Sequence, residues 1–147
     1  MKRAIELALH NVAQGGQPFG AVLVKNEEII GEGVNELHLH VDSTGHAESL
    51  ALRRAQQKLK TTDLQGAVMY ASGVPCPMCF GAMAMANVER AYYANSLAEA
   101  TAVGLTRSSE IYADLQKAEA ERNFQMIHMP VDKEEMSPMH VWYKKGE

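Results

Sequence analysis

Two short stretches, His46-Ala47-Glu48 and Pro75-Cys76-Pro77-Met78-Cys79, organise this chain. They supply one imidazole, two thiols placed i and i+3, and a carboxylate two residues after the imidazole. A structural zinc site usually closes its tetrahedron with four Cys or His ligands, whereas a catalytic site uses three and leaves the fourth position to water. The chain has only two cysteines, so the residues predict three ligands, with His46 as the third.

Both stretches are expected at the start of helices. Pro75 fits at or near a helix start, where its missing N–H costs little, and Cys76 and Cys79 then share one face of the first turn. The helix dipole and the unpaired amides there stabilise thiolate, the form that binds metal. Because Thr44-Gly45-His46 precedes a second helical run, we expect two helix N-termini to face one metal.

Glu48 is not needed as a metal ligand, which leaves it available for proton transfer. Bound zinc lowers the pKa of its water to about 7, and a nearby carboxylate can carry that proton to a leaving group. This is the chemistry of hydrolytic deamination, and His-x-Glu with Pro-Cys-x-x-Cys is the signature recorded for zinc deaminases. The alternatives are a redox pair, which leaves His46 and Glu48 unexplained, and a structural zinc knuckle that borrows another histidine.

These motifs resemble the cytidine/deoxycytidylate deaminase superfamily, and within it most closely the guanine deaminase branch of small nucleobase aminohydrolases. The resemblance runs over nearly the whole chain. Besides the two motifs above, the matching stretches are Gly15 to Val22, Gly33-Val34-Asn35, Phe80 to Met83, Ser137-Pro138 and Trp142.

The resemblance implies an α/β fold of three layers, α/β/α, around a central mixed sheet of five strands. It also implies one zinc ion per chain, bound by His46, Cys76 and Cys79, with Glu48 as the catalytic residue. The expected reaction is deamination of a nucleobase, nucleoside or similar heterocycle, with release of ammonia. The members commonly form homodimers, and in some of them the partner subunit is domain-swapped and completes the active site.

Substrate-binding residues are predicted partly from the residues and partly from the resemblance. Asn35 by itself is typical of a turn, but the family's Asn at this position hydrogen-bonds the base. Ala47 is also predicted to bind the substrate. A pocket for a small ring needs aromatic walls, and the candidates, each of a type found more often in a core than in a pocket wall, are Phe19, Tyr112, Trp142 and Tyr143. Phe19 and Trp142 are preferred because they lie in matching stretches.

The chain departs from the guanine deaminase branch after Gly104. That branch carries an acidic pair before an aromatic-Ile-Tyr segment, and one of those carboxylates reads the guanine edge. Here the segment from Leu105 to Tyr112 lacks the pair. Glu110 either replaces it from a shifted position or is an ordinary acid of a first helical turn. The substrate is therefore left open among guanine, cytosine, cytidine, isocytosine and a triazine or cyclic amidine.

Two other functions compete. The tRNA adenosine deaminases share both motifs, but they need a basic surface. The net charge of −4 argues against a nucleic-acid partner, and the one basic cluster, residues 53, 54, 58 and 60, is typical of a solvated helix face. A non-catalytic binding module that keeps zinc for stability leaves Glu48 without a role.

Length and composition indicate one domain over residues 1–147. At 46% hydrophobic and 22% charged residues, the chain has a globular composition and no apolar run long enough to span a membrane. Met1-Lys2-Arg3 briefly resembles a signal peptide, but Glu6 and His10 interrupt the apolar stretch that follows. We therefore expect a cytoplasmic protein with a small-molecule substrate and no membrane partner.

Strands alternate with helices in the expected element order, which gives the α/β class. The predicted helices are 2–14, the run after residue 46, 76–87, 97–102, 109–120 and 137–144. The predicted strands are 20–25, 28–34, 66–71, 89–93 and 124–129, the first two joined at Asn26 by a tight turn.

Overall fold

The computed structural model describes residues 1–130 and 137–145, and its contacts divide the chain into two units, Met1–Ala113 and Asp114–Glu147. The elements of the first unit, in chain order, are α1 (Lys2–Ala13), β1 (Gly20–Lys25), β2 (Glu28–Val34), α2 (Ala47–Leu59), β3 (Val68–Gly73), α3 (Pro77–Met85), β4 (Arg90–Asn95), α4 (Leu97–Ala102) and most of α5 (Arg107–Leu115). The second unit contains the end of α5, a 3-10 turn (Glu119–Glu121) and α6 (Pro138–Lys144). No helix in the described ranges is long and apolar enough to cross a membrane.

The first unit is built on a mixed sheet with the strand order β2-β1-β3-β4. β1 pairs antiparallel with β2 and with β3, and β3 pairs parallel with β4. The β1–β2 hairpin turns at Asn26 and Glu27, whose φ angles are 51° and 64°. Positive φ at both central residues is the geometry that matches the twist of a two-residue hairpin.

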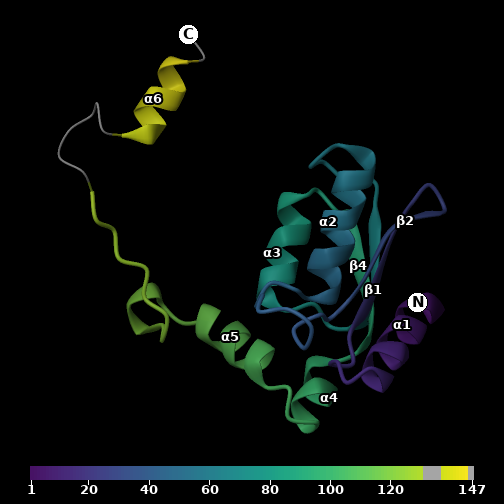
Figure 1. Cartoon of the computed structure of the whole chain (residues 1–147). Helices are drawn as coiled ribbons and strands as arrows, with labels where there is room; N and C mark the ends of the chain where they lie inside the picture. The colour runs from purple at the N-terminus through teal and green to yellow at the C-terminus, as the bar shows by residue number, and fades with distance from the viewer. Residues whose placement is uncertain (131–136, 146–147) are drawn as a thin grey trace. The chain divides into compact units, whose positions relative to one another are not determined.

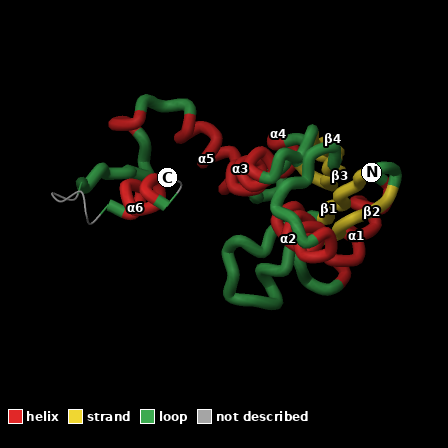
Figure 2. Tube along the Cα trace, turned by 90° about the horizontal axis from the view of Figure 1, so that it is seen from above, coloured by secondary structure: helices red, strands yellow, loops and turns green. Residues whose placement is uncertain are grey.

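Helices cover both faces of the sheet, as Figure 1 shows. A Cβ atom at Gly20 would collide with the backbone of α1, whereas one at Gly33 would collide with Ala47 O in α2. Gly33 pairs with Ala21, the neighbour of Gly20, and adjacent residues of a strand point to opposite faces. α1 and α2 therefore pack on opposite faces, and α3 runs beside α2 (Figure 2). This is the predicted three-layer order.

The hydrophobic core lies mostly between the sheet and α2 and is built largely from small side chains. Ala51 and Ala55 of α2 are fully buried, and a Cβ atom at Gly31 would collide with Ala51 O. Alanine on the helix and glycine on β2 let the two backbones approach closely, because neither carries a bulky side chain. This approach sets the position of the N-terminus of α2.

The prediction of a fifth strand is wrong for the described chain. Residues 124–129 form no strand, and the sheet has four strands. Their apolar side chains had suggested a strand, but a strand forms only where a neighbouring backbone completes its hydrogen bonds. The described part of the second unit contains no other strand to supply them. The predicted helix 109–120 is likewise shorter, since α5 ends at Leu115.

Two glycine substitutions test the close packing of α2 on β2. We expect Gly33→Ala to lower the free energy of unfolding by about 1–3 kcal/mol, because its Cβ would meet the backbone of Ala47. Gly81→Ala is the matched control. Gly81 lies inside α3 with no atom within 4 Å of a built Cβ, so alanine should raise stability by about 0.5–1 kcal/mol. Urea unfolding of both variants measures the difference; equal effects would contradict the packing described.

Candidate metal centre and active site

Two helix N-termini bring the predicted metal ligands together. His46 is the N-cap of α2 and Cys76 is the N-cap of α3, and both have extended backbone conformations. α3 begins at Pro77, in the first turn, where the missing N–H of proline costs no hydrogen bond. We had expected Pro75 to fill that role, so the helix begins slightly later than predicted and Cys76 precedes its first turn.

The ligand atoms of His46, Cys76 and Cys79 lie close enough to share one ion. His46 Nδ1 is 3.4 Å from Cys76 Sγ, and the three ligand atoms all lie within 4.8 Å of one another. Tetrahedral bonds of about 2.1–2.3 Å separate neighbouring ligand atoms by about 3.6 Å. One nitrogen and two sulfurs at this spacing fit one zinc ion per chain, and three protein ligands are the number typical of a catalytic site.

The local hydrogen bonds favour a thiolate at Cys76. Its side chain interacts with the thiol of Cys79, which is the largest cause of a lowered pKa at Cys76, and Cys79 N donates to Cys76 Sγ at 3.5 Å. The same interaction raises the pKa of the Cys79 thiol, and the contact with Cys76 raises the pKa of His46. A cluster that favours a thiolate at Cys76 is suited to a divalent cation, because thiolate is the form that binds metal.

Glu48 lies in the first turn of α2 and is almost completely buried, with 5% of its surface exposed. Burial is the largest cause that raises the pKa of its carboxyl group, because the charged form loses hydration. A carboxylate in such a place accepts and releases a proton more readily near neutral pH than an exposed one. The structure thus places a buried carboxyl group in the same cavity as the metal ligands His46 and Cys76.

One cavity of about 680 Å³ reaches Glu48 and two of the metal ligands, His46 and Cys76. Four of the predicted functional side chains besides Glu48 line it: Phe19, Asn35, His46 and Cys76. Phe19 also packs against β3, where a Cβ atom at Gly73 would lie 2.9 Å from Phe19 Cε1. The volume suits a small heterocyclic ligand.

Three predicted substrate-binding residues are not in this lining. Ala47 is buried in the core, with 1% of its surface exposed. Glu110 accepts a hydrogen bond from Thr106 Oγ1 at 2.7 Å and pairs with Arg107 at 3.3 Å on the surface. Trp142 belongs to α6 of the second unit and is 77% exposed. Their contacts with substrate stay predictions.

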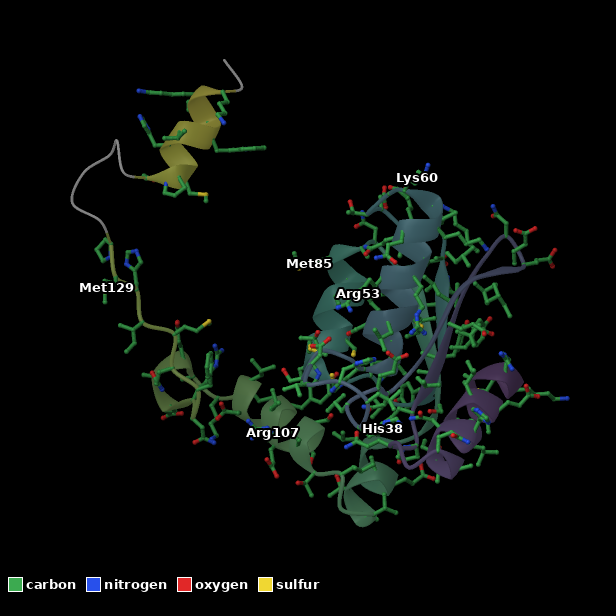
Figure 3. All side chains as sticks on the ribbon, in the orientation of Figure 1. His38, Arg53, Lys60, Met85, Arg107 and Met129 are labelled. Atoms are coloured by element: carbon green, nitrogen blue, oxygen red, sulfur yellow. The ribbon has the colours of Figure 1, made fainter. Side chains whose placement is uncertain are left out.

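The cavity also contains residues that the sequence did not single out. Gln17 lines it from the loop before β1, and Arg107, Ser108 and Ile111 line it from the first turns of α5 (Figure 3 labels Arg107). Gln17 carried a weak signal, since it directly precedes Pro18-Phe19 in a stretch that matches the family. The α5 residues also carried a signal, because they lie in the segment from Leu105 to Tyr112, where the chain departs from the guanine deaminase branch.

A hydrogen bond attaches α5 to Pro75, the residue before the metal ligand Cys76. Tyr112 Oη donates to Pro75 O at 2.7 Å, and the Tyr112 side chain lines a second, smaller cavity of about 310 Å³. Tyr112 was a candidate wall of the substrate pocket. The structure instead places its side chain in the second cavity, where its hydroxyl binds Pro75, the residue before Cys76.

Comparison with known proteins identifies the family. The sequence profile of the cytidine and deoxycytidylate deaminase zinc-binding region matches residues 1–95. Guanine deaminase of Bacillus subtilis is 38% identical over 143 residues, which are 97% of this chain and 90% of that protein. A tRNA-specific adenosine deaminase of Buchnera aphidicola is 38% identical over 96 residues, which are 65% of this chain and 64% of that protein.

Solved structures agree with the sequence matches. The crystal structure of guanine deaminase from Bacillus subtilis superposes with a TM-score of 0.88 at 38% identity and covers 97% of this chain and 90% of its own. A relative in complex with 8-azaguanine gives a TM-score of 0.66 at 34% identity and covers 70% of this chain and 60% of its own. With the His46, Glu48, Cys76 and Cys79 cluster, these matches show that the chain belongs to the cytidine and deoxycytidylate deaminase family of zinc-dependent deaminases.

Proposed function

We propose that this protein is a zinc-dependent aminohydrolase that removes an amino group from a nucleobase or a similar small heterocycle. The observation that carries the proposal is the position of Glu48, a buried carboxylate that lines the same cavity as two of the metal ligands. The match to guanine deaminase over nearly the whole chain supports guanine as the first substrate to test. Cytosine, cytidine, isocytosine and a triazine or cyclic amidine are the related candidates.

In this mechanism His46, Cys76 and Cys79 hold the ion, and Glu48 moves the protons. A bound zinc ion supplies Lewis acidity, which lowers the pKa of water at the metal to about 7. Glu48 takes a proton from the attacking water as the oxygen adds to the ring carbon that bears the amine. It delivers this proton to the ring nitrogen, then takes the second proton from the hydroxyl now on the ring carbon and passes it to the amine, so that ammonia leaves and a ring carbonyl remains.

Asn35 and Phe19 are proposed to hold the ring during these steps. Asn35 lies at the end of β2 and is 1% exposed, so its amide hydrogen bonds to a ligand would be shielded from water. Phe19 offers an aromatic face in the same cavity, suited to stack on a heterocycle. Trp142, Ala47 and Glu110 complete the proposed substrate contacts on the strength of the family resemblance alone.

The relatives that deaminate adenosine in tRNA give a second candidate function. A surface for tRNA needs free cations, but Arg54, from the basic cluster on α2, is used inside the protein. Its Nη1 donates to Glu32 O at 3.0 Å and its Nη2 pairs with Glu36 at 2.6 Å. Together with the net charge of −4, this favours a small-molecule substrate over tRNA.

The outer face of α3 and β4 supports the proposed homodimer. The cavity of about 310 Å³ on this face has mainly apolar lining residues, including Phe80, Met83 and Tyr93. Phe80 is 63% exposed and Met85, which projects from α3 in Figure 3, is 89% exposed. An apolar patch beside an edge strand is typical of a surface that another chain covers. A cytoplasmic location and one domain over residues 1–147 belong to the same proposal.

Removal of a thiol tests the ligand set. We expect Cys76→Ala to reduce bound zinc from about one per chain to near zero, because two ligands hold the ion far more weakly than three. Leu9→Ala, at an exposed position on α1, is the control and should keep its zinc. Metal analysis after dialysis measures both. Full zinc content in Cys76→Ala would show that Cys76 is not a ligand.

Removal of the proton carrier tests the reaction. Glu48→Gln keeps the size of the side chain but cannot transfer protons, so we expect kcat to fall about 10²–10⁴-fold while zinc stays near one per chain. Ammonia release is measured with guanine, isocytosine, cytosine, cytidine, adenosine, a triazine and a tRNA anticodon stem.

Several outcomes decide between the candidate functions. Turnover of a free ring by wild type supports the proposal, and turnover of the tRNA stem alone replaces it with the tRNA function. Zinc binding without turnover of any substrate favours a binding module. A Glu48→Gln protein as fast as wild type would refute the role of Glu48.

A charge on the apolar face tests the dimer. We expect wild type to sediment as two chains and Tyr93→Lys to sediment as one, since a buried unpaired ammonium opposes association. Leu9→Lys adds the same charge to the α1 face and should leave the dimer intact. A monomeric wild type would remove the dimer from the proposal, and a dimeric Tyr93→Lys protein would place the interface elsewhere.

A further inference from the structure

A network of carboxamide groups joins α1 to the cavity. Asn11 lies in α1, is 4% exposed, and donates from Nδ2 to Gln17 O at 2.8 Å and to Asn35 O at 2.9 Å. Phe19 N also donates to Gln17 O, at 2.8 Å. The carbonyl of Gln17 therefore accepts two hydrogen bonds, which hold this residue at the wall of the cavity.

The turn before Gln17 is packed tightly enough to keep the network in place. A Cβ atom at Gly16 would collide with the carboxamide of Asn11 and would lie 2.5 Å from His38 Cε1. Only glycine lets the backbone pass this close to the Asn11 side chain. The position of Gln17 is thus built into the fold, although its side chain is exposed to solvent in the cavity.

The side chain of Gln17 lies against Asn35 in a defined orientation. Leu37 N donates to Asn35 Oδ1 at 3.2 Å, which identifies the oxygen of that amide, and Asn35 Nδ2 donates to Gln17 Oε1 at 3.1 Å. Gln17 Oε1 is therefore an acceptor for Asn35, and the amide nitrogen Nε2 is left as the free end. Within residues 1–130 and 137–145, no protein atom accepts a hydrogen bond from Nε2.

We propose that Gln17 is a substrate-binding residue, which donates from Nε2 to a ring carbonyl and so selects heterocycles with an oxo group beside a ring N–H. The inference rests on the proposed deaminase function and narrows its substrate class. Gln17 Oε1 continues to accept the hydrogen bond from Asn35 Nδ2, while Nε2 faces the ligand. The two carboxamides then bind the ring edge that lies away from Glu48.

The chemistry of the reaction explains why such a residue is needed. The amine and the adjacent ring nitrogen must face Glu48 and the metal ligands, so those atoms cannot distinguish one amino-heterocycle from another. Discrimination has to come from the remaining ring edge. A carbonyl on this ring edge accepts a hydrogen bond from Gln17 Nε2. A ring without the carbonyl leaves Nε2, and part of the Asn35 carboxamide, without a partner on the ligand.

The experiment uses two ring pairs that differ in the oxo group and the ring N–H beside it: guanine with 2-aminopurine, and cytosine with 4-aminopyrimidine. Binding is measured by calorimetry with zinc-loaded Glu48→Gln protein, in which turnover is removed. Gln17→Met deletes both polar atoms of the carboxamide, whereas Gln17→Glu keeps an acceptor for Asn35 and deletes the donor. Gln57→Met, on the exposed side of α2 outside the cavity lining, is the matched control.

We expect the reference protein to prefer the oxo member of at least one pair. That preference, the ratio of the two Kd values, should fall about tenfold in Gln17→Met and in Gln17→Glu, with zinc content and Tm unchanged. Gln57→Met should retain the preference. Full preference in Gln17→Glu would show that Gln17 acts only through Asn35, and full preference in Gln17→Met would show that it does not act at all; either result overturns the proposal.

Turnover by wild type separates this inference from the proposed function. In one outcome the Gln17 variants lose the preference for the oxo ring, but wild type releases no ammonia from any ring. This result would refute the deaminase proposal and leave Gln17 as a ligand contact. Ammonia release by wild type with unchanged preference in both variants would support the deaminase and refute the role of Gln17.

Discussion

The close approach of α2 to β2 is the constraint on which the rest of the structure depends. Gly31 and Gly33 present no side chain to the helix, so the backbone of α2 lies directly on the strand. Because the helix is held at this depth, its first residues emerge at a defined point beside the sheet. His46 and Glu48 are two residues apart at that point, the first a metal ligand at the cavity and the second a buried carboxyl group that is the proposed proton carrier.

The metal site needs the N-terminus of α3 as well as that of α2. Cys76 caps α3, and α3 runs beside α2, so an imidazole and two sulfurs converge where two sets of unpaired amides and two helix dipoles meet. These dipoles favour anions. They lower the cost of keeping thiolates together, and a cation held by these ligands would in turn offset the charge of the nearby Glu48. Each helix by itself would supply an incomplete site.

The cavity joins an end lined by the metal ligands to an end lined by the surface helix α5. The metal ligands and Glu48 sit on helices packed against the core, whereas Arg107, Ser108 and Ile111 come from the surface helix α5. Tyr112 links the two ends through its hydrogen bond to Pro75. The amide network around Asn11, Gln17 and Asn35 forms a third wall that is held from α1. In the proposed function, reaction chemistry and ring selection therefore depend on different parts of the fold.

The sequence by itself determined the local elements and the chemistry. Alternating and helical periodicities predicted the hairpin, α1 and α4 closely, and ligand type and spacing predicted the zinc set and Glu48, because these depend on neighbours in the chain. Tertiary structure decided what depends on distant partners. Residues 124–129 look like a strand but have no pairing partner among the described residues. Gln17 and α5 reach the cavity through long-range packing; the resemblance drew attention to the α5 segment, but no local pattern placed it beside the metal ligands.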